Sequence, residues 1–163
     1  MKLALISDTH LPRGQRGLPA AVISRLKAAD LIVHAGDFSR LSVLRELEAY
    51  GQVVAVHGNV DDAELWRLLP SSTEIELEAG VRLAVIHDAG PATGRLKRLR
   101  RRFPHAHAVV FGHSHIPLHQ TGPDGLQIFN PGSPTDRRRS PHHTMGMAVT
   151  SAGGLDFETS VVD

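Results

Sequence analysis

The sequence predicts an α/β fold, and three observations lead to that prediction. Short apolar runs of strand length alternate with amphipathic helical patterns through the first two-thirds of the chain. The last third is mostly strand and turn patterns, which favour antiparallel hairpins. The 163 residues are 41% hydrophobic and 21% charged, which is typical of one compact globular domain over residues 1–163. We therefore expect two packed sheets with helices outside them.

The first third of the chain alternates strands and helices. Apolar runs at 3–7 (LALIS), 31–36 (LIVHAG) and 53–59 (VVAVHGN) have the length of buried strands. Residues 18–30 predict a helix with Pro19 near its first turn. Residues 41–50 predict a second helix, with leucines at every third position on one face. This β-α-β-α-β order indicates a sheet that is at least partly parallel.

Hairpins and one basic helix make up the rest of the chain. Residues 93–103 predict a helix rich in arginine, and residues 107–112 predict another buried strand. Three pairs of alternating segments are separated by glycine-containing turns and predict hairpins or neighbouring strands: 72–79 with 81–87, 117–121 with 126–130, and 145–151 with 155–162.

Composition excludes several classes of protein. The chain has no cysteine, so it has no disulfide and no thiolate metal site, and any metal must be bound by nitrogen and oxygen. No apolar run reaches the length of a membrane span, and the start MKLALIS is too short for a signal peptide. We expect a cytoplasmic protein that does not act at a membrane.

Metal-ligating residue types follow the ends of five predicted strands. Ligands of open α/β sheets bind outside the carboxyl ends of the strands. Any one of these residues alone is a weak signal, because a single histidine there is more often satisfied by a backbone hydrogen bond. Packing gives no reason, however, for five strand ends that all carry such side chains. The set is Asp8, His10, Asp37, Asn59, His87, His113 and His115.

Seven donors exceed what one cation needs and favour two divalent ions. A carboxylate at the centre of the set can bridge two cations about 3.5–4 Å apart. Asp8 and Asp37 supply negative charge, and neutral imidazoles complete the coordination. Mixed ligation of this kind suits transition metals. We expect two such ions, with manganese placed first and nickel, iron, cobalt or zinc as alternatives.

In order and spacing, the motifs DTH, GD, GN, H, GHSH and NPGS resemble those of the calcineurin-like metallophosphoesterases. The resemblance covers essentially the whole chain and is strongest to the small single-domain bacterial and archaeal phosphodiesterases, to which the retromer subunit Vps29 is related. It implies a four-layer α/β/β/α sandwich of two mixed β-sheets flanked by helices. It also implies one metal held by Asp8, His10, Asp37 and His115, and another held by Asp37, Asn59, His87 and His113.

The resemblance implies hydrolysis of a phosphate ester, most simply a small phosphodiester. The attacking group would be a hydroxide bridging the two metals, in line with the leaving group, with no covalent protein nucleophile. Larger relatives carry an Asp and a His that can protonate the leaving group. Here Arg40 and Val60 stand in their places, so no protein general acid is identified and leaving groups of low pKa should be favoured. Asp88 and Ala89 also depart from the usual pattern after His87.

Substrate contacts are less well defined than the metal ligands. Asn59, Arg138 and Arg139 are the candidates, since arginine can hold a phosphate oxygen through paired N–H donors. A solvated loop is an equal alternative for the run Arg137–Arg139. The helix RLKRLRRR is interpreted as a solvated face that could also attract anionic substrates. His34 and His57 are interpreted as core or supporting groups.

Two other functions compete with hydrolysis. A Vps29-like scaffold would keep the fold and bind protein partners without turnover, but all seven ligand positions are filled here. Nucleic-acid binding has only charge in its favour, because the basic segments lack the aromatic residues on which bases stack. We therefore expect nucleic acid only as a possible substrate, and a homo-oligomer is allowed.

Overall fold

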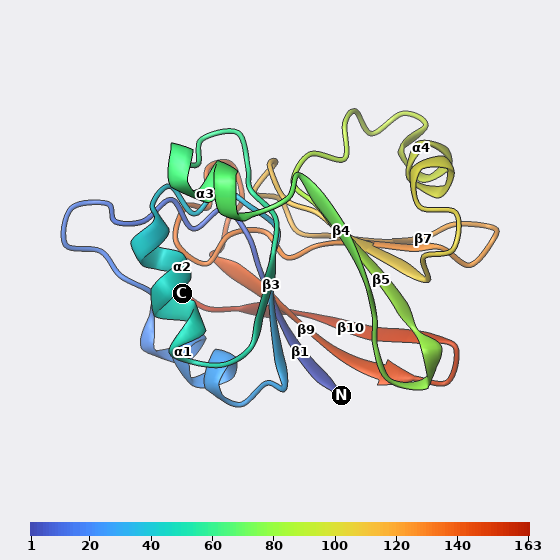
Figure 1. Ribbon diagram of the computed structural model, residues 1–163, viewed down its shortest axis with the longest axis horizontal. Helices are drawn as coiled ribbons and strands as arrows, with labels where there is room; N and C mark the ends of the chain where they lie inside the picture. Colours follow the sequence, from blue (N-terminus) through green and yellow to red (C-terminus); the bar gives the residue numbers. More distant parts are fainter.

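The first of two five-stranded sheets carries the amino terminus of the chain. The computed structural model describes residues 1–163 (Figure 1). The strand order is β10-β9-β1-β2-β3, in which β1, β2 and β3 are parallel and β9 is antiparallel to both of its neighbours. The strands are β1 (Lys2–Ile6), β2 (Leu31–His34), β3 (Val53–Ala55), β9 (Thr144–Ser151) and β10 (Gly154–Val161).

The second sheet contains the middle of the chain and has the order β4-β5-β6-β8-β7. Its three central strands are parallel, and the two edge strands are added as antiparallel hairpins. The strands are β4 (Ser72–Glu76), β5 (Arg82–Ile86), β6 (Ala108–Val110), β7 (Leu118–Thr121) and β8 (Gln127–Asn130), with a 3₁₀ turn η1 (Glu78–Gly80) between β4 and β5.

Alternation along the strands produces four layers. In β1, Leu3 and Leu5 belong to the core between the sheets, whereas Ala4 and Ile6 pack toward helices on the outer face. In β5 the same period of two divides residues between the inner core and the side of the last helix. The helices are α1 (Ala20–Lys27), α2 (Leu41–Glu48), α3 (Ala63–Leu68) and α4 (Arg95–Arg102). The predicted sandwich of two mixed sheets flanked by helices is confirmed.

Helix α3 was not predicted. It has only six residues, and its single buried side chain is Leu65, so it has no apolar stripe that would reveal it. Its local signal is the acidic residue before it: Asp62 accepts a hydrogen bond from the Leu65 amide at 3.0 Å and caps the helix. The helix lies between β3 and β4.

The arginines of α4 do more than the solvated face that the sequence suggested. Arg95 and Arg98 donate to the carbonyl oxygens of Ala89, Gly90 and Pro91 at 2.7–3.2 Å. They therefore fasten the loop that follows β5 to the helix. None of the helices combines the length and the apolar character needed to cross a membrane.

Candidate dinuclear metal centre

The predicted ligands converge at one edge of the sandwich. β1 starts at the amino terminus and ends at the upper edge in Figure 1, and its parallel neighbours end there too. Ligand atoms of six residues fall into two groups, each with its atoms within 4.8 Å of one another. The first group is Asp8, His10 and His115, and the second is Asp37, His87 and His113. These are the two sets that the resemblance implied, apart from Asn59 and the shared Asp37.

The first group is buried. Asp8 and His115 have no exposed surface, and the Nε2 atom of His115 lies 3.3 Å from Oδ1 of Asp8. The Nε2 atoms of His10 and His115 are 3.2 Å apart. Their rings stack with centroids 5.0 Å apart. Two imidazoles and one carboxylate therefore turn their ligand atoms toward a common point.

The second group is more open. Oδ1 of Asn59 lies 3.1 Å from Nε2 of His87 and 3.2 Å from Nδ1 of His113, so the amide joins this group. His87 is buried, whereas Asn59 and His113 are exposed. This half of the site is therefore the half that solvent and a substrate can reach.

Asp37 lies between the two groups. Its Oδ2 atom is 3.6 Å from Nε2 of His10 in the first group and 3.3 Å from Nε2 of His87 in the second. Its Oδ1 atom accepts a hydrogen bond from the Val60 amide at 3.0 Å, which fixes the orientation of the carboxylate. A single oxygen thus faces both groups, which is one of the arrangements by which a carboxylate can bridge two cations.

Two histidines are oriented by backbone carbonyls. Nδ1 of His87 donates to the carbonyl oxygen of Ala35 at 2.7 Å, and Nδ1 of His115 is hydrogen bonded to the carbonyl oxygen of Asp136. When Nδ1 carries the proton, Nε2 of the neutral ring carries a lone pair. That lone pair faces carboxylate oxygens in both cases, so acceptors meet acceptors and a positive charge must lie between them. The donor set therefore fits divalent cations.

Burial sets the protonation of the first group. Burial raises the pKa of Asp8 from 3.8 to about 7, although His87 and the Ser7 hydroxyl favour its charged form. Burial lowers the pKa of His115 to about 4 and also lowers that of His10. His115 is therefore neutral near pH 7, which is the state that binds metals.

The shared carboxylate is held in its charged form. Burial opposes ionisation of Asp37, but the hydrogen bond and charge of His87 outweigh it and lower the pKa to about 2. The reciprocal effect raises the pKa of His87 despite its burial. Without a cation, the charge of Asp37 therefore favours the protonated form of His87.

The backbone at the site lies in a region that most residues avoid. Positive φ values are sparsely populated by residues other than glycine, and they cluster at functional sites. Five of the seven predicted ligands have them: Asp8 (56°), His10 (47°), Asp37 (61°), His113 (68°) and His115 (59°).

Two glycines allow the backbone to approach the carboxylates closely. A Cβ atom at Gly58 would lie 2.0 Å from Oδ1 of Asp37. A Cβ atom at Gly112 would lie 1.9 Å from Oγ of Ser7 and 2.6 Å from Oδ2 of Asp8. Glycine is therefore required at both positions by the packing of the ligands.

Asp61 ties the ligand loops together, a role that the sequence did not reveal. Its Oδ2 atom accepts from the amides of Asp37 at 3.1 Å and Gly58 at 2.7 Å. Its Oδ1 atom accepts from the amide of Ser39 at 2.8 Å. One buried carboxylate thus joins the loop after β2 to the loop after β3 and positions Asp37.

The NPGS segment supports the ligands that follow β6 and β1. Asn130 donates to the carbonyl oxygen of Gly112 at 2.9 Å, and Ser133 donates to the carbonyl oxygen of Asp8 at 2.8 Å. His34 is fully buried, 3.1 Å from the Thr9 hydroxyl, and accepts from the Gly36 amide. This contact agrees with the supporting role expected for His34.

The candidate substrate contacts occupy different surroundings. The charge of Arg138 contributes to lowering the pKa of His10 and His115, so this guanidinium is near the first group. Arg137 donates to the carbonyl oxygen of Pro141 at 2.6 Å and so stabilises its own loop. Arg139 is exposed. Beside the second group, a cleft of about 340 Å³ opens between Asn59, His87 and His113 and the ends of α3 and α4.

Comparison with known proteins establishes the family. The model of the calcineurin-like phosphoesterase superfamily domain matches residues 1–153. The chain belongs to this superfamily. A probable metallophosphoesterase of Methanothermobacter thermautotrophicus is 32% identical over 151 residues, which cover 91% of this chain and 86% of the relative. The family implies divalent metal ions, which the geometry of the donors supports.

Solved structures share the fold at lower identity. The structure of a novel archaeal phosphodiesterase is 19% identical, with a TM-score of 0.73 over 98% of this chain and all of that one. Vps29 of Entamoeba histolytica, solved with Zn²⁺, is 16% identical, with a TM-score of 0.76 over the full length of both chains. The fold is therefore shared with a phosphodiesterase and with Vps29, the two kinds of protein that the resemblance in sequence suggested.

The raised pKa of Asp8 gives a pH-dependent prediction for the metal-free protein. A carboxyl whose pKa rises from 3.8 to about 7 on folding destabilises the fold progressively as pH rises through that interval. Asp8→Asn removes this effect. The Tm of the wild type should therefore fall relative to that of the variant as the pH rises from 4 to 8. Calorimetry with a chelator present measures it.

Adding metal should make the wild type the more stable protein at high pH, because the cation binds the charged carboxylate of Asp8 and the variant has no such carboxylate. A constant difference in Tm at all pH values, with or without metal, would contradict the buried-carboxylate account.

The loop contacts of Asp61 predict an indirect effect on metal affinity. In Asp61→Asn, one oxygen becomes an NH₂ group, so at least one backbone N–H meets a donor in place of its acceptor and the remaining oxygen carries no full charge. The contact between the ligand loops is therefore weakened. Metal affinity should fall about 10–100-fold, the usual effect of losing a partner behind the ligands. Isothermal titration calorimetry with Mn²⁺ measures the change in metal affinity.

Asp62→Asn is the matched control, because Asp62 caps α3 and asparagine caps helices equally well. Equal affinities of the two variants would show that Asp61 does not position Asp37.

Proposed function

We propose that this chain is a phosphodiesterase that works with two divalent transition metal ions, with manganese as the first candidate. The observation that carries the proposal is the place of Asp37, one oxygen of which faces His10 at 3.6 Å and His87 at 3.3 Å. This carboxylate links two complete donor groups, and a single-metal site would have no use for the second group. Membership of the phosphoesterase superfamily supports the same conclusion.

The residues divide into two coordination sets. Asp8, His10 and His115 would hold one ion, and His87, His113 and Asn59 the other, with Asp37 shared. Two bound divalent cations supply a water molecule of lowered pKa and positive charge opposite the phosphoryl oxygens. The protein contributes the orientation: carbonyls fix the two buried imidazoles, and Asp61 fixes the loop that carries Asp37.

Access to the site favours a small substrate that enters beside the second group. Asn59 and His113 are exposed, and the cleft of about 340 Å³ begins at their side chains. The positive charge of Arg138 lies near the first group, where it can attract a phosphoryl oxygen.

The proposal includes a preference for good leaving groups. Neither Val60 nor Arg40 can donate a proton to a departing alkoxide, and both side chains are exposed. Aryl and other activated esters, whose leaving groups have low pKa values, do not need that proton. The relative solved as a novel archaeal phosphodiesterase supports diesters as the substrate class.

A Vps29-like scaffold is the second candidate. Several large apolar side chains are exposed around the ligand edge, among them Val60 (45%), Leu68 (55%) and Ile116 (48%), and could contact a protein partner. Binding of metal does not separate the two functions, because Vps29 of E. histolytica was solved with Zn²⁺. Turnover does separate them, since a scaffold needs none.

Asp37→Asn should abolish turnover. The amide carries no negative charge, so its oxygen binds divalent cations much more weakly than the carboxylate, and the variant should lose one or both metals. The assay is hydrolysis of bis(p-nitrophenyl) phosphate after chelation and restoration of Mn²⁺, Ni²⁺, Zn²⁺ or Mg²⁺, with bound metal counted by elemental analysis.

Asp156→Asn on the exposed side of β10 is the matched control. Wild-type rates in Asp37→Asn would exclude the bridging role. A wild type that binds two metals but hydrolyses no ester would favour the scaffold instead.

Arg138→Ala should weaken substrate binding more than it slows the chemical step. Loss of a hydrogen bond from a charged group costs about 1.5–3 kcal/mol, so KM should rise about tenfold or more while kcat changes less. Steady-state kinetics on the activated diester measure both constants, for Arg138→Ala and Arg139→Ala separately.

Arg137→Ala is the control, since Arg137 bonds its own loop at Pro141. If all three variants leave KM unchanged, the segment is an ordinary solvated loop.

A further inference from the structure

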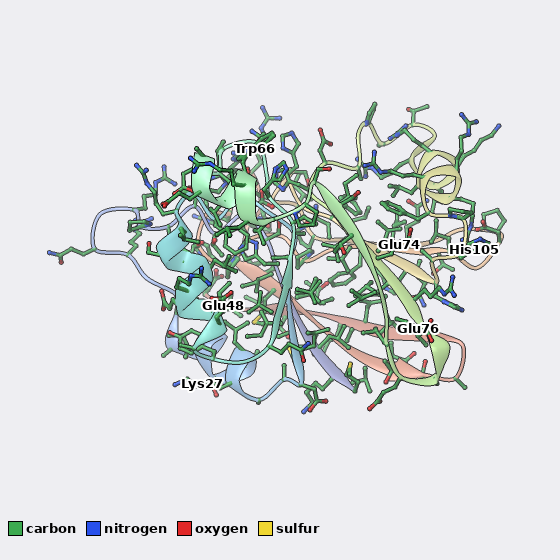
Figure 2. All side chains as sticks on the ribbon, viewed as in Figure 1. Lys27, Glu48, Trp66, Glu74, Glu76 and His105 are labelled. Carbon is green, nitrogen blue, oxygen red and sulfur yellow. The ribbon has the colours of Figure 1, made fainter.

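An aromatic wall borders the cleft beside the second donor group. The cleft is lined by His57 and Trp66 as well as by Asn59, His87 and His113. The rings of His57 and Trp66 stack with centroids 3.8 Å apart and planes 27° from parallel. Trp66 projects from α3 at the upper edge of the molecule (Figure 2).

Trp66 presents a free ring face. Its side chain is 51% exposed, although burial of an indole is strongly favourable. His57 covers one face, and no other aromatic ring or cation stacks on Trp66. The histidine thus holds the indole plane, and a second flat ring in the cleft could stack on it.

The same cleft contains a positive charge. Arg102, at the end of α4, lines it and donates to the Ser72 hydroxyl at 3.2 Å. Arg102 makes no ion pair with a carboxylate, so its charge is available to an anionic ligand. Arg102 of the basic helix α4 and the exposed Trp66 of α3, which are 36 residues apart in the sequence, therefore line the same cleft.

The dimensions of the cleft suit a small ligand. Its volume of about 340 Å³ is at the lower end of the range of about 300–1,000 Å³ found for ligand pockets. The walls offer ligand atoms for metals, an aromatic face and a guanidinium, and they also include the carboxylate of Asp88, which accepts a hydrogen bond from the Gly90 amide at 2.7 Å. A nucleotide combines the matching groups, because it joins a phosphoryl group to a flat base.

We propose that Trp66 is the stacking platform for the base of a nucleotide phosphodiester, whose phosphoryl group lies at the metal donors while Arg102 attracts its negative charge. The inference deepens the proposed phosphodiesterase function and rests on it. This platform could not be predicted from the sequence, because Trp66 is remote in the chain from both basic segments.

The fluorescence of Trp66 tests the stacking without any turnover. Trp66 is the only tryptophan in the chain, so its emission reports on this one position. Adenosine 5′-monophosphate should quench the emission of the manganese-loaded protein to saturation, whereas ribose 5-phosphate, which lacks the base, should not. Equal responses to the two compounds, or no response to either, would overturn the proposal.

Kinetics test whether the platform serves catalysis. The substrates are the p-nitrophenyl ester of thymidine 5′-phosphate and methyl p-nitrophenyl phosphate, which share a leaving group but carry a nucleoside and a methyl group, respectively. Base stacking is worth about 1–3 kcal/mol, so Trp66→Leu should reduce the ratio of their kcat/KM values about tenfold or more. Trp66→Phe keeps a ring and should keep most of the preference.

Leu68→Ala is the matched control, because Leu68 is an exposed apolar residue of the same helix and does not line the cleft. An unchanged ratio in Trp66→Leu would overturn the proposal. If the wild type hydrolyses neither ester, the phosphodiesterase function fails, and the fluorescence titration still decides whether the base stacks on Trp66.

Discussion

The structure depends on two carboxylates that are buried where the sheets meet. Asp8 is 0% exposed and Asp37 is 1% exposed, and a buried charge is costly unless charges and hydrogen bonds compensate it. Their surroundings answer that requirement. Ser7 donates to Asp8 at 2.7 Å, the amide of Val60 donates to Asp37 at 3.0 Å, and imidazoles fill the remaining directions. Burial nevertheless raises the pKa of Asp8 to about 7, because these partners do not fully compensate its charge, and a cation beside it would do so.

The loops around these carboxylates can adopt backbone conformations with positive φ because the strands that precede them are held in regular sheets. Strands β1 and β2 are each paired on both sides, and the edge strand β3 is paired with β2, so the three parallel strands fix where each loop begins. Hydrogen bonds then fix where each loop ends, above all those of Asp61 and Asn130. Ligands with positive φ are held from both directions, and the metal would find its donors already in place. The residues of the short motifs thus hold the ligand atoms in position before a metal binds.

The sequence predicted what repeats in a pattern and missed what depends on single contacts. Strand alternation in β1 and β5, the hairpins and the convergence of seven donors follow from periodicity and from the position of motifs at strand ends. The role of Asp61 could not be predicted, because a carboxylate that accepts amides from two loops looks the same in a sequence as a solvated one. Helix α3 was missed since it buries only Leu65, and the arginines of α4 were assigned to solvent although Arg95 and Arg98 bind carbonyls.

These missed elements surround the open half of the site. The motif residues define the metal donors, and the first group is enclosed, so it offers a substrate little surface to recognise. Recognition must therefore come from the side of Asn59 and His113, where α3 contributes Trp66 and α4 contributes Arg102. Neither helix carries a ligand, so both can change without disturbing the buried carboxylates. An edge of metal donors built from short motifs, bordered by two helices that carry no ligand, can keep one chemistry while the shape and charge of the cleft beside it change.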